Sequence, residues 1–127
     1  MVKRRFTPAE AARALPLVRR IVEDVLASGR ELQGLAARPS APGNRERAGA
    51  LQARLAELEQ ELARIGCSYK GAGFEHGLID FPGELDGREV LWCWKSDEAA
   101  LGWYHAPEDG FAGRKPIPPE LLPTPTE

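Results

Sequence analysis

The chain has 127 residues, of which 43% are hydrophobic and 28% are charged, and its formal net charge is −2. These values predict one soluble globular domain over residues 1–127, large enough to bury a core. No hydrophobic run approaches the roughly 20 residues that cross a bilayer, so we expect no membrane association. The slightly acidic balance disfavours nucleic acid as a partner. Charge is unevenly spread, with a net +4 over residues 1–66 and −6 over residues 67–127.

Cysteine usage indicates the compartment. The chain has two cysteines, Cys67 and Cys93, and they do not form a CxxC pair. Residues 1–6 are basic, but a helix signal follows them instead of the hydrophobic run of a secretory signal peptide. A reducing cytoplasm is therefore the expected location.

Residues 7–66 predict two long helices. Thr7, Pro8 and Glu10 form a helix start in which Thr7 caps the helix and Glu10 completes a capping box. Pro16 lies inside this predicted helix and indicates a kink there. Apolar or small residues then alternate at spacings of three and four, typical of a coiled-coil-like seam. These residues are Ala11, Leu15, Val18, Val22, Val25, Gly29 and Leu32.

A loop over residues 38–44 separates this helix from a second one. Asn44 is the expected N-cap, and Gly66 is the expected left-handed residue at the end. A short loop between two long helices predicts an antiparallel hairpin. Ile21, Leu26 and Leu35 lie beside the narrow seam, and a sheet or a second copy of the chain would cover them. We therefore expect a homo-oligomer formed through the helices.

Residues 67–117 predict a small β region. A strand at 78–81 ends at Pro82-Gly83, a turn at Asp86-Gly87 precedes a strand at 89–95, and a third strand follows at 100–105. The six prolines of the C-terminal part predict a flexible tail over residues 118–127. The predicted fold is therefore α+β: a long antiparallel helical hairpin, a three-stranded antiparallel sheet and a Pro-rich tail.

The register of the last two strands follows from the turn chosen. With Asp97 and Glu98 at the tip, Trp92 pairs with Trp103 and Val90 with His105. Trp94 then pairs with Leu101, and these six side chains share one face of the sheet. An odd-length loop would instead exchange the faces of one strand.

Several motifs together resemble a bacterial family catalogued as domain of unknown function 2203. The motifs are Phe6-Thr7-Pro8-Ala9-Glu10-Ala11, Leu15-Pro16-Leu17-Val18, Gly77-Leu78-Ile79-Asp80-Phe81-Pro82, Asp86-Gly87-Arg88-Glu89-Val90, Leu91-Trp92-Cys93-Trp94, Glu98, Trp103-Tyr104-His105 and Gly110-Phe111-Ala112-Gly113-Arg114. The family usually has Leu-Cys-Trp and Trp-His where this chain has Leu-Trp-Cys-Trp and Trp-Tyr-His. The resemblance covers residues 6 to about 117 and implies a fold and a set of motif residues, but no activity.

His105 is the central candidate for chemistry. With Glu98 or Asp80 as an orienting carboxylate, it would serve as a general base, and with Glu98 or Asp80 as a second ligand it would bind a divalent metal. Cys93 is a further candidate ligand for a divalent metal, whereas its position within a strand disfavours a nucleophilic role. Cys67 and His76 would complete a Cys2His2 set, but the spacing matches no standard zinc motif. A histidine packed at a sheet edge is the structural alternative.

Four further residues are candidates for binding a small anionic ligand: Arg88, Arg114, Trp94 and Trp103. A guanidinium in a glycine-rich loop suits a carboxylate or phosphate, and tryptophans offer a stacking surface. The alternatives are a salt bridge from Arg114 to Asp80, Glu98 or Asp109, and tryptophans that pack in the core.

Three functions are consistent with these features. The first is a cytoplasmic, oligomerising binding module with a polar pocket for a small anion or a metal. The second is a small hydrolase or isomerase with His105 as general base and Arg114 as an electrostatic clamp. The third is structural assembly through the helical hairpin alone, which predicts sensitivity to charged substitutions at Leu55 or Leu58.

Overall fold

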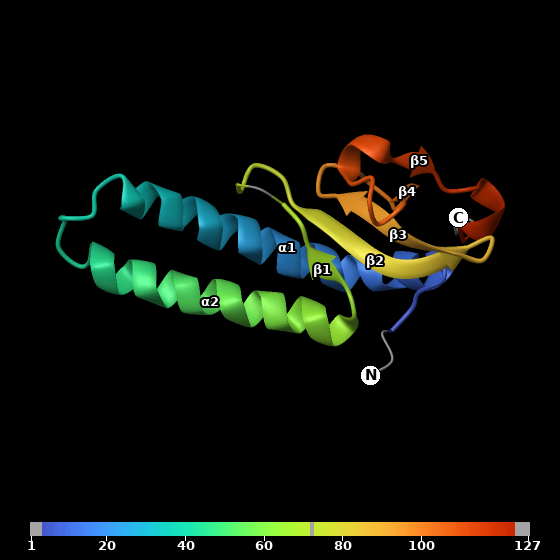
Figure 1. The fold of residues 1–127 in the computed structure, drawn as a ribbon. Coiled ribbons are helices and arrows are strands. Elements are labelled where there is room, and N and C mark those ends of the chain that lie inside the picture. The colour runs from blue at the N-terminus through green and yellow to red at the C-terminus, as the bar shows by residue number, and fades with distance from the viewer. Residues whose placement is uncertain (1–3, 72, 124–127) are drawn as a thin grey trace.

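The computed structural model describes residues 4–71 and 73–123, in which a helical hairpin packs against an antiparallel sheet (Figure 1). Helix α1 spans Pro8–Ala36 and helix α2 spans Asn44–Ile65. The two helices lie side by side and run in opposite directions, which confirms the predicted hairpin. The α+β class is also confirmed.

The helix ends follow the local sequence closely. The Thr7 hydroxyl accepts from the Glu10 amide at 3.1 Å, and the Glu10 carboxylate accepts from the Thr7 amide at 2.9 Å, which is the expected capping box. Gly66, at φ 112°, ends α2 in the left-handed conformation. Asn44 is the first residue of α2 and Gly43 is the cap. The side-chain Nδ2 of Asn44 donates to the Arg38 carbonyl at 2.7 Å.

The sheet has five strands in the order β1-β2-β3-β4-β5, so the predicted three-stranded sheet was wrong. Both additional strands lie at the edges and have two residues each, too short for any periodic pattern to be visible in the sequence. The strands are β1 Ser68–Tyr69, β2 Leu78–Leu85, β3 Arg88–Lys95, β4 Trp103–His105 and β5 Lys115–Pro116.

Strand β2 continues through Pro82 and Gly83, where the sequence predicted its end. Pro82 is tolerated because β1 pairs with β2 only at Asp80 and Ile79, so position 82 is not flanked by β1. The N-terminal segment takes that place, since the Phe6 amide donates to the Pro82 carbonyl at 2.7 Å. The expected Asp86-Gly87 turn is present, with both residues at positive φ (53° and 77°), as a type I′ hairpin requires.

The register between β3 and β4 differs by one residue from the prediction. Trp92 pairs with Tyr104, and Cys93 pairs with Trp103. The predicted pairing of Trp92 with Trp103 was wrong because the connection from Ser96 to Gly102 is not a two-residue turn. A one-residue shift exchanges faces, so Trp103 and His105 lie opposite the face that carries Trp92.

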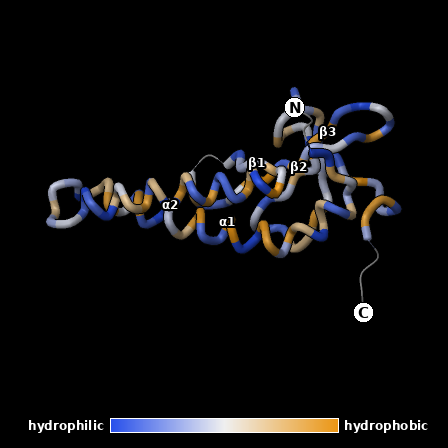
Figure 2. Tube along the Cα trace, turned by 90° about the horizontal axis from the view of Figure 1, so that it is seen from below, coloured by the Kyte–Doolittle hydropathy of each residue, from blue (hydrophilic) through white to orange (hydrophobic). Residues whose placement is uncertain are grey.

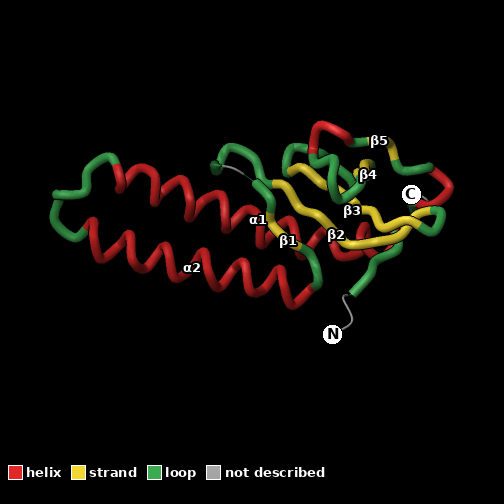
Figure 3. The backbone as a smooth tube through the Cα atoms, in the orientation of Figure 1, coloured by secondary structure: helices red, strands yellow, loops and turns green. Residues whose placement is uncertain are grey.

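The core lies between α1 and one face of the sheet. Trp92, Trp94 and Phe81 are fully buried there, with α1 residues such as Val18 and Val22 in the same cluster. The hairpin extends beyond the sheet, so its far end is formed by the two helices and their loop alone (Figure 3). Hydrophobic and hydrophilic positions alternate along both helices (Figure 2).

The predicted flexible tail, residues 118–127, is only partly described. A short 3-10 helix spans Pro119–Leu121, and residues 124–127 lie outside the described residues. In residues 4–71 and 73–123, no helix combines the length and hydrophobicity that a membrane crossing requires.

Candidate metal centre

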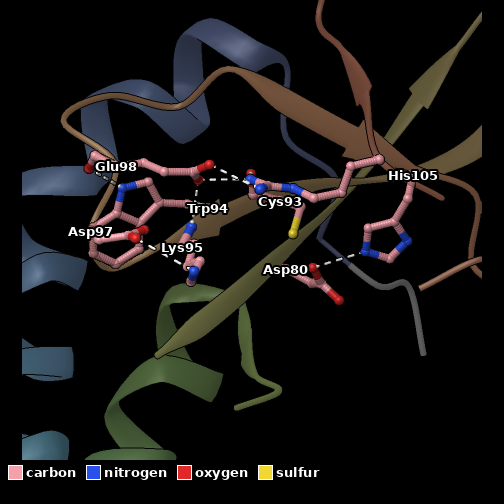
Figure 4. A network of polar contacts seen from close by, with 8 residues as sticks. Asp80, Cys93, Trp94, Lys95, Asp97, Glu98 and His105 are labelled. Carbon is pink, nitrogen blue, oxygen red and sulfur yellow. Dashed lines mark hydrogen bonds and ion pairs between the residues drawn. The ribbon is translucent and has the colours of Figure 1, made fainter. Parts of the chain in front are cut away.

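Asp80, Cys93 and His105 come from three adjacent strands and meet on one face of the sheet (Figure 4). Asp80 pairs with Cys93 across β2 and β3, and β4 brings His105 beside them. One ligand atom from each residue lies within 4.8 Å of the other two. The three residues are 5%, 1% and 4% exposed, so the cluster is shielded from bulk solvent.

The two ring nitrogens of His105 both face acceptors. Nδ1 lies 2.8 Å from the Ala106 carbonyl oxygen, and Nε2 lies 3.2 Å from Oδ1 of Asp80. Because a carbonyl oxygen can only accept, Nδ1 carries a proton. The contact between Nε2 and the Asp80 carboxyl is then satisfied by one proton carried by either partner, or by a cation bound between them. This is the orientation of a histidine that binds metal through Nε2 while its other nitrogen donates to the backbone.

Burial and the nearby Asp80 carboxylate, acting against Arg114, together raise the pKa of the Cys93 thiol to about 12. Without a cation the thiol is therefore protonated at neutral pH and is not a nucleophile. A divalent metal beside Asp80 would supply the positive charge that a thiolate needs.

Arg114 occupies a second cluster beside the first. Its guanidinium makes two bonds to the Glu98 carboxylate, at 2.6 and 2.9 Å, and Nη2 also donates to the Cys93 carbonyl at 3.1 Å. The rings of Trp103 and Phe111 contact it, at 5.1 and 4.7 Å from ring centroid to guanidinium. The hydrogen bonds of Arg114 therefore connect the segment after β4 to Glu98 and to the backbone of Cys93, which is one of the three candidate metal ligands.

The residues expected in one polar pocket are thus divided between two clusters. Asp80 is the carboxylate that contacts His105, while Glu98 binds Arg114 and accepts from the Lys95 amide at 2.7 Å. Arg88 is exposed at the start of β3, in a separate hollow.

The remaining candidates lie elsewhere. Trp94 is fully buried, with its indole nitrogen donating to the Glu98 carbonyl at 2.9 Å, so its rings are not available to a ligand. Cys67 packs in the helix-facing core and His76 is exposed, so neither belongs to the Asp80 cluster. Phe111 was not among the predicted site residues. Its position in a glycine-flanked loop shortly before Arg114 is the sequence feature that could have indicated a ring packed on the guanidinium.

These features define a class: a helical hairpin on a small antiparallel sheet, with a buried Asp-Cys-His cluster on the face that lies away from the helices. The chain belongs to the family described as an uncharacterized conserved protein, DUF2203, whose model matches residues 4–117. The matched region contains all three cluster residues and both members of the Arg114–Glu98 pair. Neither the curated proteins nor the solved structures give a match.

Proposed function

We propose that the protein is a binding module for a divalent transition metal ion such as Zn²⁺, held by Asp80, Cys93 and His105. The observation that supports this most strongly is the orientation of His105, whose Nδ1 is committed to the Ala106 carbonyl while Nε2 faces the Asp80 carboxylate. Nitrogen, sulfur and oxygen together form the ligand set that Zn²⁺ accepts.

The distances fit such an ion. Ligand atoms about 2.0–2.3 Å from a tetrahedral zinc lie roughly 3.5 Å from one another. The Nε2 to Oδ1 distance of 3.2 Å is close to this value, and a maximum separation of 4.8 Å within the cluster requires only small side-chain shifts. Three protein ligands leave a fourth position for water or for a small anion, the other ligand class that the sequence favoured.

The first experiment is calorimetric titration of metal-stripped protein with Zn²⁺, together with Co²⁺ absorption spectroscopy. We expect one ion per chain and a sulfur-to-cobalt charge-transfer band. Asp80→Asn and His105→Ala should each weaken binding by at least roughly tenfold. Cys93→Ser should also remove the charge-transfer band, because the band requires a cobalt–thiolate bond.

Two matched controls remove the same residue types outside the cluster. His76→Ala and Cys67→Ser should leave the affinity and the cobalt band unchanged, because these residues lie apart from it. Circular dichroism on each variant separates loss of binding from loss of fold. A folded wild-type protein that takes up no ion, or equal binding in cluster and control variants, would show that Asp80 and His105 form a structural pair.

A second candidate function is that of a small hydrolase or isomerase in which His105 acts as the general base. Its support is the Asp80 contact, which orients the ring as in a general base. Its weakness is that His105 is 4% exposed and its Nδ1 is already bonded to the backbone. A turnover that persists in His105→Ala would rule it out.

Self-association through the helices is a third element of the proposal, and a cytoplasmic location agrees with two free cysteines. The supporting observation is the far end of the hairpin, which extends beyond the sheet (Figure 3). Leu32 and Leu35 are only half-buried there and line a hollow of about 550 Å³. Coiled-coil-like packing against a second hairpin would cover both residues.

A further inference from the structure

A groove between α1 and the segment before β4 lies apart from the metal cluster. Its volume is about 710 Å³, within the roughly 300–1,000 Å³ typical of small-molecule sites. Much of its lining is aliphatic, from Ala12, Leu15 and Pro16 on α1, Leu101 before β4, and Leu122 near the end of the described chain. The groove therefore suits a flexible hydrocarbon.

Two arginines give one side of this groove a positive charge. Arg19 and Arg20 line it together with one carboxylate, Glu23, so the local balance is one positive charge. Neither arginine forms an ion pair within the described residues. A ligand carrying a single negative charge would complement this balance, whereas a doubly charged phosphate would be opposed by Glu23.

The Arg19 guanidinium is held in place without being saturated. Nη2 donates to the Ala99 carbonyl at 2.8 Å, and the group lies 5.5 Å from the centre of the Trp94 ring. In the described part of the chain this is its one hydrogen bond. Nε is buried without an acceptor, so the donors left for a ligand are those of Nη1 and Nη2. A fixed guanidinium with unused donors is suited to a carboxylate, because little side-chain entropy is lost on binding.

We propose that this groove binds a small aliphatic carboxylate, with the carboxylate on Arg19 and the hydrocarbon tail against Leu15, Leu101 and Leu122. The site is independent of the proposed metal centre, since none of its residues belongs to the Asp80 cluster. Apolar contact provides most of the affinity, and the arginine determines the head group.

The test is calorimetric titration of the full chain with decanoate below its micelle concentration, with decanol as the uncharged comparison. We expect saturable binding of one decanoate and an affinity about tenfold lower for decanol, because a hydrogen bond to a charged group is lost. Zn²⁺ is omitted, so the result does not depend on the metal proposal.

Two variants test the two ends of the groove. Arg19→Gln should reduce decanoate affinity about tenfold and leave decanol binding unchanged. Ala12→Phe places a ring in the groove from α1 and should abolish binding of both ligands, without removing any contact of Arg19. Arg13→Gln, which removes an exposed arginine on the same helix outside the groove, should bind like the wild type.

Each outcome decides the proposal. It is overturned if folded wild-type protein shows no saturable decanoate binding, or if Ala12→Phe binds decanoate normally. Equal affinity for decanol and decanoate would overturn the role of Arg19. If Arg19→Gln unfolds because it loses the contact with Trp94, two measurements that keep Arg19 still test the proposal. They are the comparison of decanol with decanoate on the wild-type protein, and decanoate binding by Ala12→Phe.

Discussion

At the residue scale, Asp80 and His105 form a polar side-chain contact at 3.2 Å inside the protein. Both side chains are almost fully buried, where an unpartnered charge or hydrogen-bonding group is costly. Removing either partner of such a pair typically costs about 3–5 kcal/mol, because the remaining group stays buried. The pair therefore affects folding even when no metal is bound.

We predict that Asp80→Ala and His105→Ala, each in the presence of a chelator, lower the free energy of unfolding by about 3 kcal/mol. The double variant should lose clearly less than the sum, since both partners are then absent. Urea denaturation measures all three. Glu31→Ala is the control, because its Arg47 partner is exposed and such surface pairs contribute less than about 1 kcal/mol. Additive losses in the double variant would contradict a coupled pair.

Cys67 provides a pH-dependent prediction away from the candidate metal centre. Burial raises the pKa of its thiol from 9.0 to about 12. The unfolded chain therefore loses this proton first as the pH rises. The contribution of the Cys67 thiol to the free energy of unfolding is therefore fully present below pH 9. It is lost between pH 9 and about 12, by up to roughly 1.4 kcal/mol per pH unit.

The measurement is the free energy of unfolding of metal-free protein between pH 8 and 11. Cys67→Ala should be less stable at pH 8 through lost packing, but its stability should fall less steeply above pH 9. Identical slopes for wild type and variant would show that the Cys67 thiol ionises as readily in the folded chain as in the unfolded one.

The sequence indicated which residues could belong to the candidate site, but not which of them lie together. Asp80, Cys93 and His105 were selected by chemical type, but Glu98 was an equal candidate for the His105 partner. That choice depends on which strands are adjacent and on their register, and neither is encoded locally. The Ala106 carbonyl, which orients the ring, is backbone and has no sequence signal.

At the element scale, the N-terminal segment is joined to the sheet through an indole. The Trp92 Nε1 donates to the Phe6 carbonyl at 2.7 Å, directly over Gly83. Gly83 is required there because a side-chain Cβ would lie 2.8 Å from the Phe6 carbonyl oxygen and still closer to the Trp92 indole. Strand β2 therefore passes beneath Phe6, in the segment before α1, only if position 83 lacks a side chain.

We predict that Gly83→Ala lowers the free energy of unfolding by about 3 kcal/mol, through overpacking and loss of the Trp92 hydrogen bond. Gly102→Ala is the matched control, since a Cβ there meets no atom within 4 Å and the residue is not at positive φ. Thermal or urea denaturation of both variants provides the comparison. Equal stability of the two variants would mean that the N-terminal segment is not fixed over Gly83.

The elements that were predicted correctly carry strong local signals. The capping box at Thr7, the left-handed Gly66 and the Asp86-Gly87 turn each fix the backbone through neighbouring residues. The errors have non-local causes. Strands β1 and β5 exist only by pairing with longer strands, and Pro82 is accepted because Phe6 replaces a neighbouring strand.

At the scale of the whole molecule, the protein is asymmetric. Near the sheet, α1 is covered by Trp92 and Trp94, and the loop before β2 reaches it at Gly29 and Arg30, whereas the far end of the hairpin extends beyond the sheet (Figure 1). Residues 1–66 carry a net charge of +4 and residues 67–127 a net charge of −6. Two regions of opposite net charge are consistent with the proposed contact between copies, although charge directs association more than it strengthens it.

The residues that test assembly must lie outside the core of one chain. Leu58 is 1% exposed and belongs to the shared core, so a charge there would unfold the protein whether or not copies associate. Leu35 is half-buried at the far end of the hairpin and lines the hollow that a second hairpin would fill. A charge at Leu35 therefore reports on association with little effect on the core.

We predict that the wild-type protein sediments as a multimer and that Leu35→Glu sediments as a monomer with an unchanged far-ultraviolet circular dichroism spectrum. Leu17→Glu is the control, because Leu17 is 55% exposed in the first half of α1, away from the Leu35 hollow, and should leave the multimer intact. Analytical ultracentrifugation over a range of concentrations makes the comparison. A wild-type monomer at every concentration would rule out assembly through the hairpin, and dissociation by Leu17→Glu alone would move the interface to the sheet end of α1.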